Sequence, residues 1–311
     1  MNEYDVLVIG GGAAGLSAAL VLARAQRRVA VIDAGEPRNA PAAHMQGFLS
    51  REGLSPAQLL RLGRQEVTGY GADVIAGRVS GVHRTADAAP RFEVRLADGD
   101  TLHGRRVLVA TGLRDVLPDI PGVRERWGRD FLHCPYCHGH EVRAQPLGVI
   151  GATREAVAHA HLVRQWSPDV VLFTHTDGLA EDDREALLAR AIGVVEGPVA
   201  RLVVEDDALA GVELTDGRFV PRTAVFVRPR MVPDNDVLAD LGCAFDDQGW
   251  VVADPTGRTS VPGVWVAGNV ANPRAQVITA AGEGSAAAIA LNADLVDEDI
   301  AAAVREYRRS T

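Results

Sequence analysis

The clearest pattern of hydrophobic and polar positions lies at the start of the chain. Residues Tyr4 to Ile9 form an apolar strand pattern, Leu16 to Ala25 an apolar helix pattern, and Val29 to Ile32 a second strand pattern that ends at Asp33. The glycine-rich turn Gly10-Gly11-Gly12-Ala13-Ala14-Gly15 joins the first strand to the helix. The first 35 residues therefore predict a βαβ unit.

The same pattern returns twice further along the chain. Leu147 to Trp166 predicts a strand, a turn at Gly151-Ala152-Thr153 and a helix, and Val170 to Phe173 predicts the next strand. Near the end, Val264 to Ala267 predicts a strand and about Gln276 to Leu295 an Ala-rich helix. We therefore expect an α/β fold with two Rossmann-like three-layer nucleotide-binding domains, the second inserted into the first.

The predicted boundaries follow from these three blocks. The outer domain takes residues 1–116 and 240–311, and the inserted domain takes residues 117–239. Between the first two blocks, Ser55-Pro56 predicts the start of a helix that runs to about Thr68, because serine is a preferred N-cap and proline a preferred first helical residue.

The first glycine turn matches the pattern G-x-G-x-x-G, with an acidic residue about 20 positions later. Gly10 permits the tight turn, Gly12 lets the backbone approach a pyrophosphate, and Gly15 brings the helix against the strand. The free N–H groups at the helix start favour the negative phosphates, and Asp33 is placed to accept hydrogen bonds from ribose hydroxyls. The turn therefore predicts a dinucleotide site.

Composition excludes several classes of protein. The 311 residues suit two domains, and 47% hydrophobic with 23% charged residues is typical of a globular chain. All 32 basic residues are arginine because the chain contains no lysine, which excludes Schiff-base enzymes and P-loop kinases. The net charge of −9 argues against a nucleic-acid partner.

Cysteine usage points to a reducing compartment. The three cysteines, Cys134, Cys137 and Cys243, are too few for a disulfide-stapled secreted scaffold. No signal-peptide pattern opens the chain and no apolar run is long enough for a membrane span, so we expect a cytoplasmic protein with no membrane partner. We expect Cys243 to be buried filler, whereas the Cys-x-x-Cys pair indicates either redox work or half of a metal site.

The metal alternative depends on the histidines around the pair. His133, Cys134, Cys137, His138 and His140 are all possible zinc ligands. Structural zinc usually needs a second pair to close the tetrahedron, and the sequence has none. The redox interpretation is therefore favoured, with His133 and His140 as packing or solvent-facing residues.

Several motifs together resemble one family. Gly10 to Gly15, Ala110-Thr111-Gly112, Cys134-Pro135-Tyr136-Cys137-His138-Gly139, Gly268-Asn269-Val270 and the segment Gln276 to Gly282 occur in the order seen in low-molecular-weight thioredoxin reductases. The resemblance implies a flavin-dependent disulfide oxidoreductase that binds FAD non-covalently in the outer domain and carries its redox cysteines in the inserted one. It also implies a homodimer.

The resemblance assigns roles to single residues. Cys134 exchanges with the substrate, Cys137 faces the flavin, and His138 stands where the family usually has an aspartate as proton donor and acceptor, a role that an imidazole can fill. The residues expected to bind FAD are Gly10, Gly12, Ala13, Ala14, Gly15, Asp33, Arg38, Asn39, Gln46, Ala110, Thr111, Gly112, Gly268, Asn269, Gln276 and Val277. Gln46 is equally well explained as a polar loop residue or as a contact to substrate.

The second nucleotide unit departs from this family. Its turn has Thr153 where the middle glycine lets a pyrophosphate approach, and residues 174–177 after the next strand contain no arginine to bind a 2′-phosphate. Efficient use of NADPH is therefore not expected. Asn269 also replaces the family's aspartate.

These departures, with Pro37-Arg38-Asn39 and the cysteine motif, resemble the branch of dithiol oxidases. We therefore expect FAD-dependent oxidation of a small or peptide dithiol with O₂ as acceptor. The same features leave two alternatives open. One is a reductase of thioredoxin or a thioredoxin-like protein fed by ferredoxin or NAD(P)H, and the other is a non-catalytic flavin redox sensor.

Overall fold

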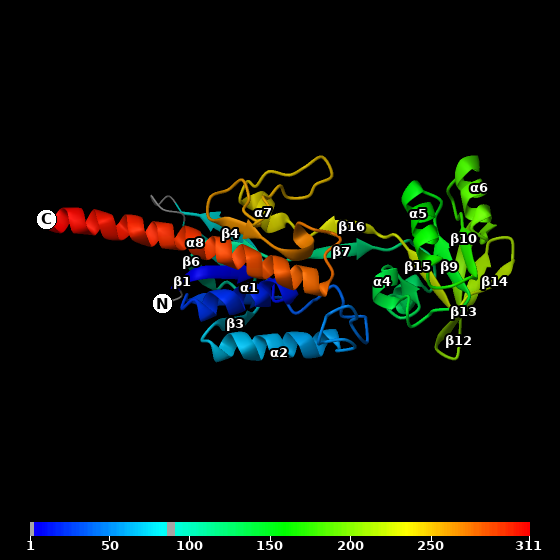
Figure 1. Ribbon diagram of the computed structural model, residues 1–311, viewed down its shortest axis with the longest axis horizontal. Coiled ribbons are helices and arrows are strands. Elements are labelled where there is room, and N and C mark those ends of the chain that lie inside the picture. The colour runs from blue at the N-terminus through cyan, green and yellow to red at the C-terminus, as the bar shows by residue number, and fades with distance from the viewer. Residues whose placement is uncertain (1–2, 86–90) are drawn as a thin grey trace.

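The computed structural model describes residues 3–85 and 91–311. It contains two α/β bodies joined by a narrow two-stranded ribbon (Figure 1). The long axis of the molecule runs from the C-terminal helix of the outer domain to the inserted domain. Both bodies have the Rossmann-like architecture that the sequence predicts, with parallel strands at their centres.

The outer domain has a seven-stranded sheet in the order β3-β2-β1-β6-β5-β4, with β17 also paired to β6. Its strands are β1 (Glu3–Ile9), β2 (Val29–Asp33), β3 (Asp73–Ala76), β4 (Val79–Arg84), β5 (Phe92–Leu96), β6 (Thr101–Val109) and β17 (Val264–Val266). β1, β2, β3, β6 and β17 are parallel, whereas β4 and β5 form an antiparallel extension beside β6.

Side chains along β1 point alternately to the two faces of the sheet, and this divides the core of the outer domain into two layers. Val6 and Val8 face the layer of α1 (Ala13–Arg24), α2 (Pro56–Gly69) and α8 (Val277–Ser310), while Leu7 and Ile9 face the opposite layer. The opposite layer is covered by β4, β5 and α7 (Asp236–Asp240). A strand buried on both faces is the pattern expected at the centre of a parallel sheet.

The inserted domain has a five-stranded parallel sheet in the order β11-β10-β9-β15-β8. Its elements are α3 (Val123–Arg126), β8 (Phe131–Leu132), α4 (Pro135–His138), β9 (Leu147–Ile150), α5 (Arg154–Val163), β10 (Val170–Phe173), α6 (Glu181–Ala189), β11 (Ile192–Val195) and β15 (Ala224–Val227). An antiparallel sheet of β12 (Val199–Glu205), β13 (Ala208–Leu214) and β14 (Phe219–Pro221) covers one face.

The chain crosses between the domains in β7 (Leu113–Val116) and β16 (Arg230–Pro233), which pair antiparallel. Val237 and Leu238 lie before the predicted boundary at residue 240, yet they pack in the outer core. We therefore propose that the domains divide within this ribbon. The boundaries drawn from the sequence stay a prediction.

The last helix differs from its prediction. We expected it to end at about Leu295, but α8 continues to Ser310. Residues 296–310 contain no glycine or proline and are rich in Ala, Arg and Glu, which favour helix. Despite its length, α8 is too polar to span a membrane, and no other helix in the described part of the chain is long and apolar enough.

Candidate active site

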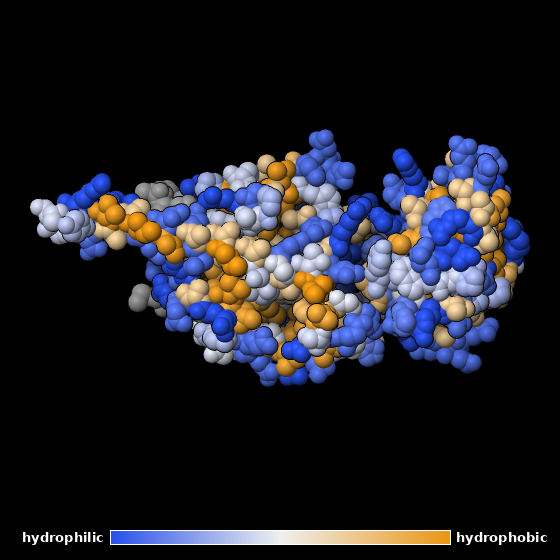
Figure 2. Space-filling model, in the orientation of Figure 1, coloured by the Kyte–Doolittle hydropathy of each residue, from blue (hydrophilic) through white to orange (hydrophobic). Residues whose placement is uncertain are grey.

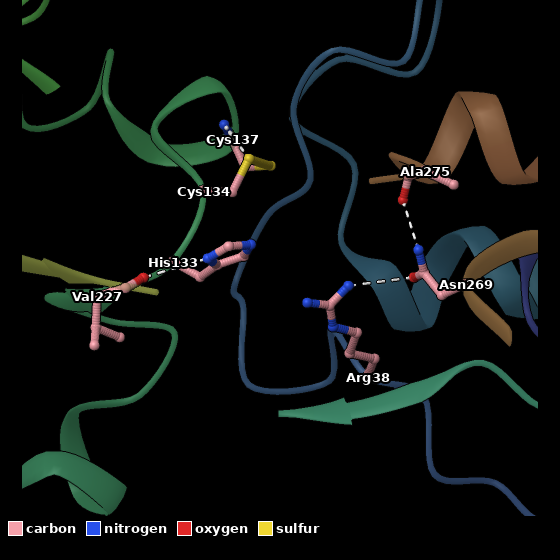
Figure 3. The surroundings of a disulfide bond; sticks show 7 residues. All are labelled: Arg38, His133, Cys134, Cys137, Val227, Asn269 and Ala275. Atoms are coloured by element: carbon pink, nitrogen blue, oxygen red, sulfur yellow. Dashed lines mark hydrogen bonds between the residues drawn. A yellow bond between two sulfur atoms is a disulfide. The ribbon is translucent and has the colours of Figure 1, made fainter. Parts of the chain in front are cut away.

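Two cysteines form a disulfide at the edge of the inserted sheet (Figure 3). Cys134 follows β8 and is the N-cap of α4, and Pro135 is buried at the first helical position, where its fixed φ suits a helix. The Cα atoms of Cys134 and Cys137 are 5.2 Å apart. The Sγ of Cys134 accepts a hydrogen bond from the backbone N–H of Cys137 at 3.2 Å, which would stabilise a thiolate on Cys134.

The histidines near the disulfide differ in their surroundings. Nδ1 of His133 lies 3.3 Å from the carbonyl oxygen of Val227. The ring of His133 also contacts the ring of His159 edge-on. Burial lowers the pKa of His133, and it lowers the pKa of His159 to about 3, so both are neutral packing residues. His140 is exposed. The two cysteines are bonded to each other, and no group of three or more His, Cys, Asp or Glu side chains that could hold a metal ion occurs among residues 3–85 and 91–311.

His138 lines a cavity of about 460 Å³ between the domains. Small and apolar side chains, Pro41 from the outer domain and Leu132 from the inserted one, form part of its wall. The amide Nε2 of Gln46 donates across it to Oε1 of Glu141 at 3.3 Å. Burial lowers the pKa of His138, and the opposing effect of Glu141 is smaller, so the imidazole is neutral near pH 7 and can accept a proton.

The first glycine turn has the form that a bound phosphate requires. Gly10 has φ +109°, and a Cβ there would lie 2.3 Å from the carbonyl oxygen of Ala110. A Cβ on Gly12, by contrast, would meet nothing within 4 Å, so the backbone there borders open space. Gly12 is the N-cap of α1 and has no side chain to accept the first free N–H groups of the helix, which include those of Ala13 and Ala14.

A hydrogen-bonded network joins three segments beside this turn. The guanidinium of Arg38 donates two bonds of 2.8 Å to Asp115 on β7. It also donates one bond of 3.4 Å to Oδ1 of Asn269 (Figure 3). The amide Nδ2 of Asn269 donates to the carbonyl oxygens of Asn272 at 2.9 Å and Ala275 at 3.0 Å. Asn269 therefore fixes the loop between β17 and α8, and Arg38 ties that loop to the ribbon.

The remaining predicted residues lie around the same space. Asp33 accepts from the N–H of Gly35 and pairs with Arg64 at 2.6 Å, and its carboxyl lies directly against Gly11. The hydroxyl of Thr111 is turned away, toward the carbonyl oxygen of Asp234. The others lie at the predicted turns. Asn39 is half-buried next to Arg38, Gly15 packs on Gly10, and Gly112 follows β6. Gly268 begins the 3₁₀ turn η1 (Gly268–Val270), Gln276 is the N-cap of α8, and Val277 is its first residue.

Comparison with known proteins agrees with this arrangement. The sequence profile described as "Pyridine nucleotide-disulphide oxidoreductase" matches residues 4–284. The chain belongs to this family. Thioredoxin reductase sirT from Leptosphaeria maculans is 33% identical to it over 96% of each chain. The crystal structure of HlmI has a TM-score of 0.96 at 62% identity, covering 98% of this chain and 96% of that one. The thioredoxin reductase of Streptococcus pyogenes MGAS5005 has a TM-score of 0.86 at 25% identity, covering 95% and 99%.

The chain is thus a flavin-dependent disulfide oxidoreductase of the thioredoxin reductase type, and its cofactor is FAD. The residues present fit that group, because the open border at Gly12 and the uncapped start of α1 leave room and donors for a pyrophosphate. We expect the turn from Gly10 to Gly15 to hold the ADP half, and the segment from Gly268 to Val277 to hold the rest.

The replacement of the family's aspartate by Asn269 has a structural reason. Its amide nitrogen donates to two backbone carbonyls, which a carboxylate could not do. The main structural role of Asn269 is therefore to hold the loop between β17 and α8 in shape.

The second nucleotide turn, between β9 and α5, is closed by the oxidoreductase's own side chains. The backbone N–H of Ala152 donates to Oδ2 of Asp177 at 3.3 Å, and the N–H of Ala156 donates to Oγ1 of Thr153 at 3.3 Å. The sequence predicted an obstruction by Thr153, which stays a prediction; the structure shows Thr153 as the N-cap of α5. The sequence did not reveal the carboxylate of Asp177 in the turn, because that contact depends on how the loop after β10 folds back.

Two further partners were missed for a similar reason. Asp115 binds Arg38 and Glu141 binds Gln46, across 77 and 95 positions of the chain. Neither acidic residue belongs to a recognisable motif. Asp115 follows the charged Arg114 in a short strand, so its neighbours in the sequence give no hint of its partner.

Proposed function

We propose that this oxidoreductase oxidises a small or peptide dithiol, with O₂ as the final acceptor, and that it works independently of NADPH. The turn between β9 and α5 is the observation that carries the proposal. Two N–H groups at this turn, those of Ala152 and Ala156, already donate to Asp177 and Thr153 and are therefore not free for a pyrophosphate. The carboxylate of Asp177 would also repel phosphate, and residues 174–177 contain no arginine to attract it.

The cysteine pair can perform the exchange in balanced steps. A substrate thiolate attacks Sγ of Cys134, the disulfide breaks, and Cys137 leaves as a thiolate. The second substrate thiol then attacks its own mixed disulfide, which releases the oxidised substrate and leaves Cys134 and Cys137 reduced. The N–H of Cys137 stabilises the departing thiolate of Cys134 through the 3.2 Å contact.

His138 is placed to manage the protons of these steps. It lies on the same helical turn as the cysteines and lines the cavity between the domains, whose volume of about 460 Å³ is within the range for small-molecule sites. Because burial keeps the imidazole neutral, it can take the proton from an entering thiol. When bound, FAD supplies the two-electron acceptor that restores the disulfide.

Anaerobic reduction of the flavin distinguishes the possible electron donors. We expect dithiothreitol, as a probe dithiol, to bleach the flavin absorbance of the purified holoprotein, and NADPH or NADH at micromolar concentration to leave it unchanged. The Cys137→Ser variant should not respond to the dithiol. Rapid bleaching by NADPH would contradict the proposal, and reduction by ferredoxin but not by dithiol would favour the ferredoxin-fed reductase.

Two further expectations from the family stay predictions. These are a cytoplasmic location and a homodimeric state.

A further inference from the structure

The cavity beside His138 is built by both domains. Its outer-domain wall is the loop of residues 40–46, and its inserted-domain wall comes from the segments 128–132 and 138–142. The molecule narrows where the two domains meet, and its surface there is mainly hydrophilic (Figure 2). The volume of about 460 Å³ suits a small molecule.

Two contacts between the domains lie in the wall of this cavity. One is the hydrogen bond from Nε2 of Gln46 to Oε1 of Glu141 at 3.3 Å. The other is the packing of Gly128 against Pro41, which is so close that a Cβ on Gly128 would lie 2.9 Å from the Cβ of Pro41. A ligand in the cavity is therefore held between the domains, and this arrangement leaves no room there for a folded protein.

The charges of the cavity wall are not balanced. Apart from histidines, the lining has two charged side chains, Arg129 and Glu141. Arg129 is neutralised by Asp207, to which its Nη1 donates at 3.0 Å and its Nη2 at 2.5 Å. In the part of the chain that the structure describes, Glu141 has the hydrogen bond from Gln46 and no ion pair. The cavity therefore carries one uncompensated negative charge.

Two acceptor atoms of the same pair are unused. The bond between Gln46 and Glu141 takes up the amide nitrogen and one carboxylate oxygen. Oε1 of Gln46 and Oε2 of Glu141 have no hydrogen-bond partner among residues 3–85 and 91–311. Both atoms accept hydrogen bonds, and the carboxylate also attracts positive and repels negative charge. Together they suit a ligand group that donates N–H bonds.

We propose that Glu141 and Gln46 select the substrate, which is a small dithiol that carries an amide or amine N–H group and no negative charge. This inference rests on the proposed oxidation of dithiols. The thiol end of the substrate reaches Cys134, while the N–H group donates to Oε2 of Glu141 and Oε1 of Gln46. His138 lies in the same wall and on the same helical turn as the cysteines, so selection and proton transfer occur in one cavity.

Three dithiols with the same pair of thiols test the selection. Dihydrolipoate, dihydrolipoamide and the aminoethyl amide of dihydrolipoic acid differ only at the far end of a flexible chain, which is an anion, a neutral amide or a cation. We expect kcat/KM for their O₂-dependent oxidation by the holoprotein to rise in that order, by roughly 3–10-fold at each step in low salt. Because Glu141 is exposed, the differences should shrink in high salt.

Glu141→Gln should remove the preference. It should raise kcat/KM for dihydrolipoate and lower it for the cationic amide, so that the three values agree to within about threefold. Opposite changes distinguish selection from an effect on the basicity of His138, which would slow all three dithiols alike. Glu181→Gln on α6 is the matched control, because it removes the same charge from a side chain that is 87% exposed, and it should leave the order unchanged.

The outcomes separate this inference from the function on which it rests. Equal kcat/KM values for the three dithiols in the wild-type protein would overturn the selection and leave dithiol oxidation intact. The same holds if Glu141→Gln slows all three by one factor. If the FAD-loaded protein oxidises none of them, the proposed function itself fails and the inference fails with it.

Discussion

Replacing Asn269 with aspartate tests whether this residue shapes the cofactor loop. The change removes both donors of Nδ2 and places a carboxylate against the carbonyl oxygens of Asn272 and Ala275. Each lost hydrogen bond costs about 1–1.5 kcal/mol, which gives about 2–3 kcal/mol for the pair. A charged acceptor for Arg38 returns about 1 kcal/mol, so the net loss is about 1–2 kcal/mol.

That loss has two measurable results. If the loop must be ordered to bind FAD, the dissociation constant should rise about 5–30-fold, since about 1.4 kcal/mol is a factor of ten. The apoprotein should unfold at a temperature about 2–8 °C lower. Flavin fluorescence titration measures the first and differential scanning fluorimetry the second.

Asn269→Ala is the matched control, because it removes the same donors without adding charge. It should weaken FAD binding to a comparable extent. If Asn269→Asp instead binds FAD as tightly as the wild-type protein, or more tightly, the loop-shaping role is refuted and a direct contact to the cofactor, as in the family's aspartate, is the better account.

Three more predictions concern the disulfide and the histidines. Cys137→Ser should leave the Cys134 thiolate free to attack a disulfide probe such as oxidised glutathione, which forms a mixed disulfide and releases one thiol, visible by intact-protein mass spectrometry, and Cys134→Ser should trap none. His138→Gln should lower the rate of flavin reduction by dithiol about a hundredfold. It should also remove the decline at acidic pH that protonation of the imidazole causes, which burial moves below the ordinary pKa of histidine, whereas an unchanged pH profile would exclude His138 as the base. His159 has a folded pKa of about 3, below its unfolded value of about 6.5, so the unfolded state binds the extra proton between these pH values. The free energy of unfolding should therefore fall by up to about 1.4 kcal/mol per pH unit below pH 6.5, and urea denaturation should show a weaker fall for His159→Phe.

Local patterns were enough to predict the frame of the fold. The βαβ unit from Tyr4 to Asp33 and the N-cap at Ser55 depend on neighbours in sequence, and the structure has both. The end of α8 was missed because the prediction stopped where the helix leaves the body. The apolar positions Val296, Ile300 and Val304 continue the helical period past that point.

The candidate site was predictable in its motifs and not in its partners. The disulfide between Cys134 and Cys137 follows from their spacing. The ion pair of Arg38 with Asp115 joins a loop of the outer domain to the ribbon, and no property of either residue alone selects the other. Contacts of this kind depend on the folded path of the whole chain.

The ribbon between the domains has a consequence for how the protein can be taken apart. Val116 on β7 and Arg230 on β16 are direct partners, so the chain leaves the outer domain and returns to it at one place. Joining those two strands by a short hairpin turn would close the outer domain without moving its ends. The inserted domain therefore takes the place of the loop that would connect two strands of a hairpin. We expect that it can be removed or exchanged while the flavin-binding domain stays one continuous chain.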